Sequence, residues 1–262
     1  MVNITLGQYF PGTSPLHRLD PRAKILLTIA LIAAVFVASS LPAYALVFLF
    51  IAGMAALSRI DVKFMVKGLK PVFFVIIFTF VLNLFFTTGG NTLLSWKFIK
   101  ITDQGLKSAG FMALRLVLLI LGTQLLTLTT SPIALTDGIE SLLKPLSKIG
   151  FPAHELAMMM SIALRFIPTL MEETDKIMKA QMARGADFET GNLVQKAKSM
   201  LPLLVPLFVI AFRRADELAM AMEARCYRGG EHRTRMKQLR FTRLDALAAL
   251  VMAALLAAVI VL

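Results

Sequence analysis

The chain has 262 residues, of which 57% are hydrophobic and only 17% are charged. A soluble domain carries about 25% charged residues, so this composition and the long uncharged runs indicate a membrane protein. The net charge of +12 comes from basic residues that cluster between the apolar runs, where they are expected to set membrane topology rather than to bind nucleic acid. The single cysteine, Cys226, excludes an internal disulfide and a cysteine metal cluster.

The amino-terminal arm, residues 7–22, is rich in proline and glycine, which favours an ordered loop over a helix. Asp20 followed by Pro21 is typical of a helix N-cap with proline at the first helical position. The first membrane helix is predicted over residues 24–41, and a second apolar run, residues 43–57, follows almost directly. Both runs are near or below the minimum of about 17 residues that usually spans a bilayer.

Two further apolar runs are predicted to be membrane helices, at residues 72–86 and 110–128. The loop before residue 72 is basic and is expected to stay in the cytoplasm. Its positive residues are Arg59, Lys63, Lys67 and Lys70. The segment 93–101 fits a short strand, an interfacial helix or a loop equally well.

Between residues 130 and 243 no run is predicted to be apolar enough, over a sufficient length, for an ordinary spanning helix. Three amphipathic helices are expected there instead, at residues 133–149, 153–184 and 193–227. The first is expected to break at Pro145, and the third to bend at two prolines, Pro202 and Pro206. A final apolar run, residues 244–262, is preceded by a basic tract.

These elements predict an all-α membrane protein with about five membrane helices and a module of long amphipathic helices on the cytoplasmic side. The expected division is an amino-terminal arm with four membrane helices (1–130), the amphipathic module (131–243) and a carboxyl-terminal membrane helix (244–262). Every strongly basic loop then lies on the same side, with the amino terminus and the module in the cytoplasm.

Two of the amphipathic helices are predicted to end in the same way, on an alanine and an arginine followed by a residue beyond the helix: Ala183-Arg184-Gly185 and Ala224-Arg225-Cys226. Either arginine alone is explained by the negative end of a helix dipole. The pair, each closing a long amphipathic helix, favours a shared function.

Small residues suggest that these two helices cross in contact. Aligning the two arginines places Ala180 on a second alanine, and Ala211, Ala215 and Ala219 form a row at intervals of four that lets helix backbones approach closely. The module is also rich in methionine, with Met160 and Met178 among the examples. Flexible thioether side chains suit a surface that repacks against different partners, although they also serve as filler in a loose core.

At these positions the chain resembles the T component, or EcfT family, of energy-coupling factor (ECF) importers for vitamins and metal ions. The resemblance covers nearly the whole chain and is most specific at the two arginine motifs. It also extends to three further segments: Leu19-Asp20-Pro21-Arg22, Thr130-Ser131-Pro132 and Ile162-Ala163-Leu164-Arg165-Phe166-Ile167-Pro168.

The resemblance implies a non-enzymatic subunit of a prokaryotic cell membrane that couples ATP hydrolysis to uptake. In that family the two arginine motifs dock into grooves of two cytoplasmic ABC-type ATPases, identical or homologous. The neighbouring helices, with the alanines and methionines above, support a membrane-embedded substrate-binding S component, with several interchangeable ones as a hypothesis. ATP and magnesium are then bound by the partners, and this chain needs no cofactor or metal; it has no Gly-x-x-x-x-Gly-Lys phosphate loop.

Two other functions are weighed against this one. A conventional ABC permease with its own substrate path would need polar groups within the membrane, and the runs offer few, chiefly Arg115 and Gln124. Arg115 is close enough to the expected outer end to reach the headgroups by snorkelling. A membrane-embedded enzyme would need a cluster of acids, histidines or metal ligands. His154-Glu155 lacks the second histidine of a zinc-protease helix, because Met158 stands in its place.

Overall fold

The structure is a computed structural model that describes residues 9–87, 89, 92–96, 99–188, 192–229 and 238–262. It divides into two compact units. Unit 1 comprises Met1–Leu142 and Lys237–Leu262, and unit 2 comprises Leu143–Met236. Each unit is described by itself.

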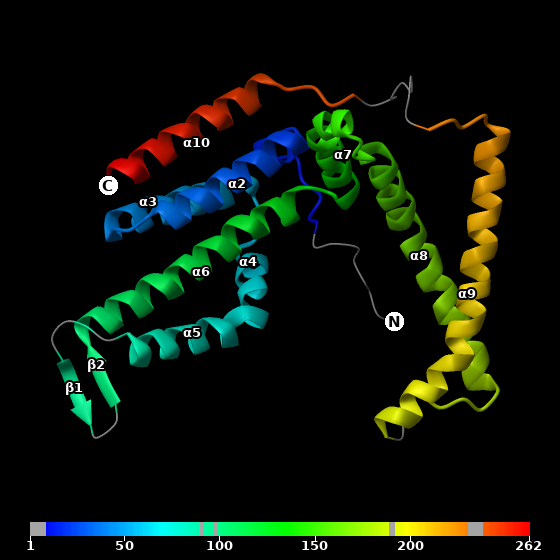
Figure 1. Cartoon of the computed structure of the whole chain (residues 1–262), viewed down its shortest axis with the longest axis horizontal. Helices are drawn as coiled ribbons and strands as arrows, with labels where there is room; N and C mark the ends of the chain where they lie inside the picture. The colour runs from blue at the N-terminus through cyan, green and yellow to red at the C-terminus, as the bar shows by residue number, and fades with distance from the viewer. Residues whose placement is uncertain (1–8, 88, 90–91, 97–98, 189–191, 230–237) are drawn as a thin grey trace. The chain divides into compact units, whose positions relative to one another are not determined.

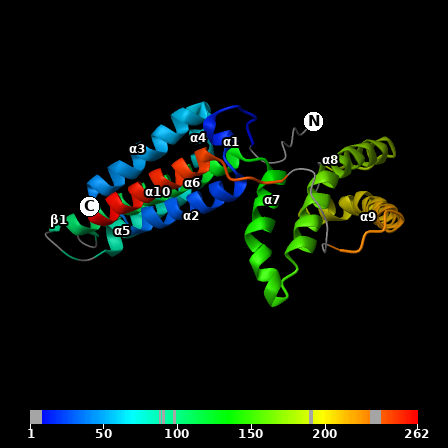
Figure 2. The same ribbon diagram turned by 90° about the horizontal axis from the view of Figure 1, so that it is seen from above.

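Unit 1 is a helical bundle with one short hairpin. Its elements are α1 (Pro15–Arg18), α2 (Pro21–Val37), α3 (Leu41–Ser58), α4 (Val62–Leu69), η1 (Lys70–Val72), α5 (Phe73–Phe86), β1 (Thr92–Trp96), β2 (Ile99–Thr102), α6 (Asp103–Thr129), α7 (Pro132–Leu143) and α10 (Arg243–Val261). Helices α2, α3, α6 and α10 run along a common direction (Figures 1 and 2). Strands β1 and β2 pair antiparallel, which confirms the strand alternative for residues 93–96 and 99–101, while residues 97 and 98 lie outside the described residues.

The core of unit 1 lies where α2, α3 and α6 meet and α10 closes the bundle. Val35 of α2, Tyr44 and Ile51 of α3 and Leu118 of α6 are almost completely buried. Helix α2 begins as predicted, because the Asp20 carboxylate caps the backbone N–H of Arg22 at 2.9 Å and Pro21 occupies the first helical position.

The basic segment that was expected to be a loop is instead helical, as α4. This helix buries Met65 and exposes Lys63 and Lys67, so the segment is amphipathic. It packs against α6 at Gly68, where an added Cβ would overlap the side-chain amide of Gln124. Because glycine leaves this space, α4 comes close enough for the Gln124 amide to donate to a backbone carbonyl of α4.

Five helical segments in the described part of the chain are long and apolar enough to cross a membrane: Leu41–Ser58, Val62–Phe86, Asp103–Thr129, Val194–Ala224 and Arg243–Val261. The predicted number is confirmed, but the set differs. Helix α2, with 17 residues, is shorter than all five. The prediction that no segment between residues 130 and 243 is sufficiently apolar is wrong by this measure, because the apolar stretch that includes Pro202 and Pro206 outweighs the charges near both ends of its helix.

Unit 2 consists of η2 (Lys144–Ile149) and two long helices, α8 (Ala153–Ala183) and α9 (Leu193–Ala224). The predicted break at Pro145 is confirmed as a change from α-helix to 3₁₀ geometry at Lys144. Helix α9 starts with a reciprocal capping box between Asn192 and Gln195 and continues through both of its prolines.

Candidate functional site

The Arg184 end, defined as residues 183–185, closes α8 with a Schellman motif. The backbone N–H of Gly185 donates to the carbonyl of Met182 at 3.0 Å, and the N–H of Ala186 donates to the carbonyl of Gln181 at 2.9 Å. Gly185 has a φ of +89°, which glycine adopts without a Cβ penalty. The predicted glycine just beyond the helix is confirmed.

The Arg225 end, defined as residues 224–226, repeats this geometry. Here the N–H of Cys226 donates to Glu223 at 2.8 Å, and the N–H of Tyr227 donates to Met222 at 3.0 Å. Cys226 holds a φ of +56° in place of glycine. A residue with a Cβ costs about 1–2 kcal/mol in this left-handed conformation, and the geometry of the helix end is nevertheless the same.

The backbones of the two arginines are nearly superimposable. Arg184 has φ −88° and ψ 5°, and Arg225 has φ −91° and ψ 11°. All six residues of the two ends are exposed. Each arginine therefore stands exposed at the negative end of a helix dipole, an arrangement suited to bidentate binding of a carboxylate.

Helices α8 and α9 cross in an antiparallel sense (Figure 1). Gln181 Nε2 lies 3.3 Å from the carbonyl oxygen of Pro202, and the guanidinium of Arg214 lies 3.7 Å from the carboxylate of Glu173. Later residues of α9 therefore contact earlier residues of α8, as in an antiparallel pair. The Arg184 end and the Arg225 end consequently lie at opposite ends of the pair.

The other predicted contact residues lie mostly on open surface. Ala211 and Met178 are half-buried, whereas four others are exposed: Met160, Ala180, Ala215 and Ala219. The structure also shows an apolar stripe on α9 that the sequence reading did not single out, with exposed side chains at intervals of three and four: Leu201, Val205, Phe208 and Phe212. Its helical periodicity was the signal that could have identified it.

A second site, in unit 1, was not anticipated beyond the Asp20 cap. The buried carboxylate of Asp245 accepts from the backbone N–H of Asp20 at 2.8 Å and from the N–H and hydroxyl of Thr242. Arg22 pairs with Asp20 at 3.0 Å, and its guanidinium lies 4.2 Å from the ring centroid of Phe241. These contacts fasten the start of α2 to the start of α10.

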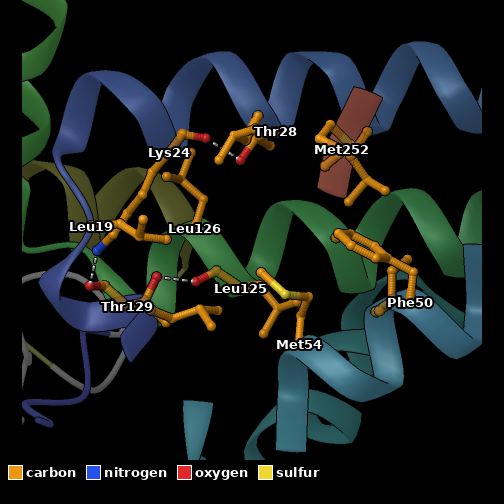
Figure 3. A pocket seen from close by; sticks show the side chains of 14 residues that line it. Leu19, Lys24, Thr28, Phe50, Met54, Leu125, Leu126, Thr129 and Met252 are labelled. Carbon is orange, nitrogen blue, oxygen red and sulfur yellow. Dashed lines mark hydrogen bonds between the residues drawn. The ribbon is translucent and has the colours of Figure 1, made fainter. Parts of the chain in front are cut away.

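Lys24 extends this network to the end of α6. Its ammonium group donates to the carbonyl of Thr129 at 2.8 Å (Figure 3). It also donates to the hydroxyl of Thr130 at 3.3 Å. Lys24 also lines a cavity with a volume of about 60 Å³. Its other lining side chains are mainly apolar, such as Phe50 and Met252 (Figure 3). This volume is well below the about 300–1,000 Å³ of a typical small-molecule site.

Arg115 and Gln124 of α6, the polar residues noted within its apolar run, have structural partners. Arg115 donates to the hydroxyl of Tyr44 at 3.0 Å and to the carbonyl of Ala38, the C-cap of α2, at 3.3 Å. Gln124 donates to the carbonyl of Phe64 at 3.1 Å. Arg115 thus binds the turn between α2 and α3 within unit 1. In the described residues no group of three or more acidic, histidine or cysteine side chains could hold a metal ion.

These features define a class: a multi-pass membrane protein whose helical bundle accompanies two crossed helices that end on arginines. The family model of CbiQ, described as cobalt transport protein, matches residues 12–236. Among similar proteins named energy-coupling factor transporter transmembrane protein EcfT, that of Thermosediminibacter oceani is 63% identical over 98% of this chain and 96% of its own. The corresponding protein of Clostridium kluyveri is 61% identical over 95% of this chain and 92% of its own, and that of Bacillus subtilis is 52% identical over 98% of each. The chain belongs to the EcfT family of energy-coupling factor transporter transmembrane proteins.

Membership of this family makes the chain a transmembrane component of an ECF transporter, which works in a complex with other subunits. The predicted resemblance is confirmed. Such a component fits a non-catalytic role, since the relatives are named as transmembrane proteins of the transporter.

Proposed function

We propose that the chain couples ATP hydrolysis by two cytoplasmic ABC-type ATPase subunits to movement of a membrane-embedded S component that carries a vitamin or a metal ion. The observation that carries this proposal is the shared backbone geometry of the Arg184 end and the Arg225 end. Two equivalent exposed ends at opposite ends of a crossed pair suit two equivalent docking partners.

Arginine suits such a joint for two reasons. Its guanidinium stays charged when it is desolvated, and its planar donors bind a carboxylate in a fixed orientation. Each arginine also follows directly on a helix of about 30 residues, so a displacement of its end moves the helix as a rigid body rather than being absorbed by a loop.

The exposed surface of unit 2 supports contact with a further membrane partner. The stripe at Leu201, Val205, Phe208 and Phe212 is apolar and is not covered by α8. We expect the S component to bind this stripe and the adjacent alanines and methionines of the module, residues 131–243. Several exchangeable S components would exploit the flexible methionine side chains.

ATP and magnesium are bound by the ATPase partners in this proposal, and the chain itself carries neither a cofactor nor a metal. The proposed orientation places the amino terminus and the arginine ends in the cytoplasm of a prokaryotic cell. It rests on the positive residues of α4 and of the tract before α10. A conventional permease is a weaker alternative, because Arg115 and Gln124 are engaged in structural hydrogen bonds rather than lining a path.

Charge reversal at either arginine tests the proposal. Arg184→Glu or Arg225→Glu replaces a donor fork with a carboxylate and should weaken recovery of an ATPase subunit with the tagged chain by at least about thirtyfold. Lys179→Glu, an exposed charge reversal on the same helix as Arg184, is the matched control and should leave recovery unchanged. Full uptake by the double variant Arg184→Glu/Arg225→Glu in reconstituted vesicles would overturn the assignment.

A further inference from the structure

The two prolines in α9 each leave one carbonyl group without its donor at i+4, that of Lys198 and that of Pro202. In an α-helix the carbonyl of residue i accepts the N–H of residue i+4. The residue four positions after Pro202 is Pro206, which has no N–H, so α9 supplies no i+4 donor to the Pro202 carbonyl. The side chain of Gln181 on α8 supplies one, with its Nε2 at 3.3 Å from this oxygen.

Gln181 also takes part in the hydrogen bonds that close α8 at the Arg184 end. Its backbone carbonyl accepts the N–H of Arg184 at 3.0 Å and the N–H of Ala186 at 2.9 Å. The backbone of this residue therefore closes α8, while its side chain binds α9. One residue connects the position of Arg184 with the proline-containing part of the neighbouring helix.

The Arg225 end has no such link from the equivalent residue. When the two arginines are aligned, Met222 corresponds to Gln181, and its carbonyl accepts the N–H groups of Arg225 at 3.2 Å and Tyr227 at 3.0 Å. A methionine side chain has no donor to offer to another helix. The two ends thus share their backbone geometry but differ in how they are attached to the rest of the pair.

We propose that Gln181 is a positioning residue that fixes the crossing of α8 and α9 through the Pro202 carbonyl. This role rests on the proposed function, in which the Arg184 end docks to an ATPase. A carbonyl without its i+4 donor keeps its lone pairs open to a neighbouring side chain, and the Gln181 amide donates to this one at the exposed surface of the helix pair. The second contact of the crossing, Glu173 with Arg214, is longer at 3.7 Å and is shared with Lys176.

The test replaces Gln181 with the residue found at the equivalent position of the other helix. Gln181→Met keeps an unbranched side chain and a similar helix propensity but removes the donor. Spin labels carried by unnatural amino acids at two exposed residues, Asp175 on α8 and Lys198 on α9, report the distance between the helices in the purified full complex and leave Cys226 unchanged. We expect two populations of distances, the native one and a second one. The ratio of the native population to the second should fall by about fivefold, as for loss of an ordinary hydrogen bond. An unchanged distance distribution overturns the proposal.

The two prolines provide a matched pair of control backgrounds. Pro206→Ala restores the helical N–H that pairs the carbonyl of residue 202, so Gln181→Met should have no further effect there. Pro202→Ala also removes a proline, but the carbonyl of residue 202 still faces Pro206, so the effect of Gln181→Met should persist. An effect that persists with Pro206→Ala, or disappears with Pro202→Ala, shows that Gln181 does not act through this carbonyl.

Transport measurements separate a positioning role from simple folding. Gln181→Met should leave recovery of the ATPase subunits unchanged, because both arginines are intact, while the ATP hydrolysed per substrate molecule rises by about fivefold. A changed distance with unchanged coupling overturns the positioning role. Failure of Arg184→Glu to weaken ATPase docking would instead overturn the proposed function, and the distance measurement would still decide whether Gln181 fixes the crossing.

Discussion

The two units of this protein bury their side chains to very different extents. In unit 1, Tyr44, Val35 and Leu118 are almost completely buried, and α2, α3, α6 and α10 cover one another. In the described part of unit 2, the only buried residues are Ala153 and Ala157. Unit 1 is therefore stabilised largely by its own contacts, whereas the long helices of unit 2 keep apolar surface available for a partner or for lipid.

Polar contacts follow the same division. In unit 1 the Asp245 carboxylate is 4% exposed and joins segments 225 residues apart. In unit 2 the contact between Arg214 and Glu173 involves partly exposed side chains. Buried hydrogen-bonded charges hold one arrangement, because an unpaired charge there is costly, whereas partly exposed pairs contribute little and permit movement. The bundle of unit 1 is therefore held by buried polar contacts, and the ion pair between Arg214 and Glu173 across the helices of unit 2 is partly exposed.

The largest effect is expected for Asp245→Ala. The substitution removes the acceptor for the backbone N–H groups of Asp20 and Thr242 and should lower the free energy of unfolding by about 3 kcal/mol. Thermal unfolding of the detergent-solubilised chain measures this loss. Asp103→Ala, which removes an exposed pair with Lys107 in the first turn of α6, should cost less than about 1 kcal/mol. Equal losses for the two variants would contradict the contrast between buried and exposed pairs.

An intermediate effect is expected at the contact between α4 and α6. Gly68→Ala adds a Cβ that would overlap the amide of Gln124, which donates to α4, and should destabilise unit 1 by about 1–3 kcal/mol. Gly53→Ala in α3 is the matched control, because no atom lies near its added Cβ. That variant should be neutral or stabilising by up to about 1 kcal/mol through helix propensity. Thermal unfolding compares the two, and similar shifts would show that packing at Gly68 is not tight.

Local signals allowed the sequence to predict where several helices begin and end. The Asp20–Pro21 start of α2, the break at Pro145 and the end of α8 before Gly185 all depend on the preferences of one or two residues. The same reasoning identified both arginine ends of the candidate site. The structure shows that their backbones match even though Cys226 replaces glycine.

Contacts between distant segments could not be read from such signals. Nothing near Asp20 in the sequence indicates that its backbone N–H meets Asp245. The pairing of Gln181 with Pro202 likewise depends on how two helices cross. The sequence showed only that the carbonyl of Pro202 lacks its i+4 donor, because residue 206 is a proline. The helical state of α4 was missed because its basic residues were interpreted only as a topology signal, while Met65 gives it a buried face.

The smallest effect on stability is expected at the exposed apolar stripe of α9, which we propose binds the S component. Phe212→Ser removes a large side chain of α9 that is 69% exposed, so the free energy of unfolding should change by less than about 0.5 kcal/mol. If the apolar stripe binds an S component, the variant should nevertheless lower recovery of that subunit with the tagged chain. Phe74→Ser in α5, where the side chain is 77% exposed, is the control and should leave recovery unchanged if it faces lipid. Equal recovery with Phe212→Ser and with the unaltered chain would show that Phe212 of α9 also faces lipid, and the S component would then have to bind elsewhere.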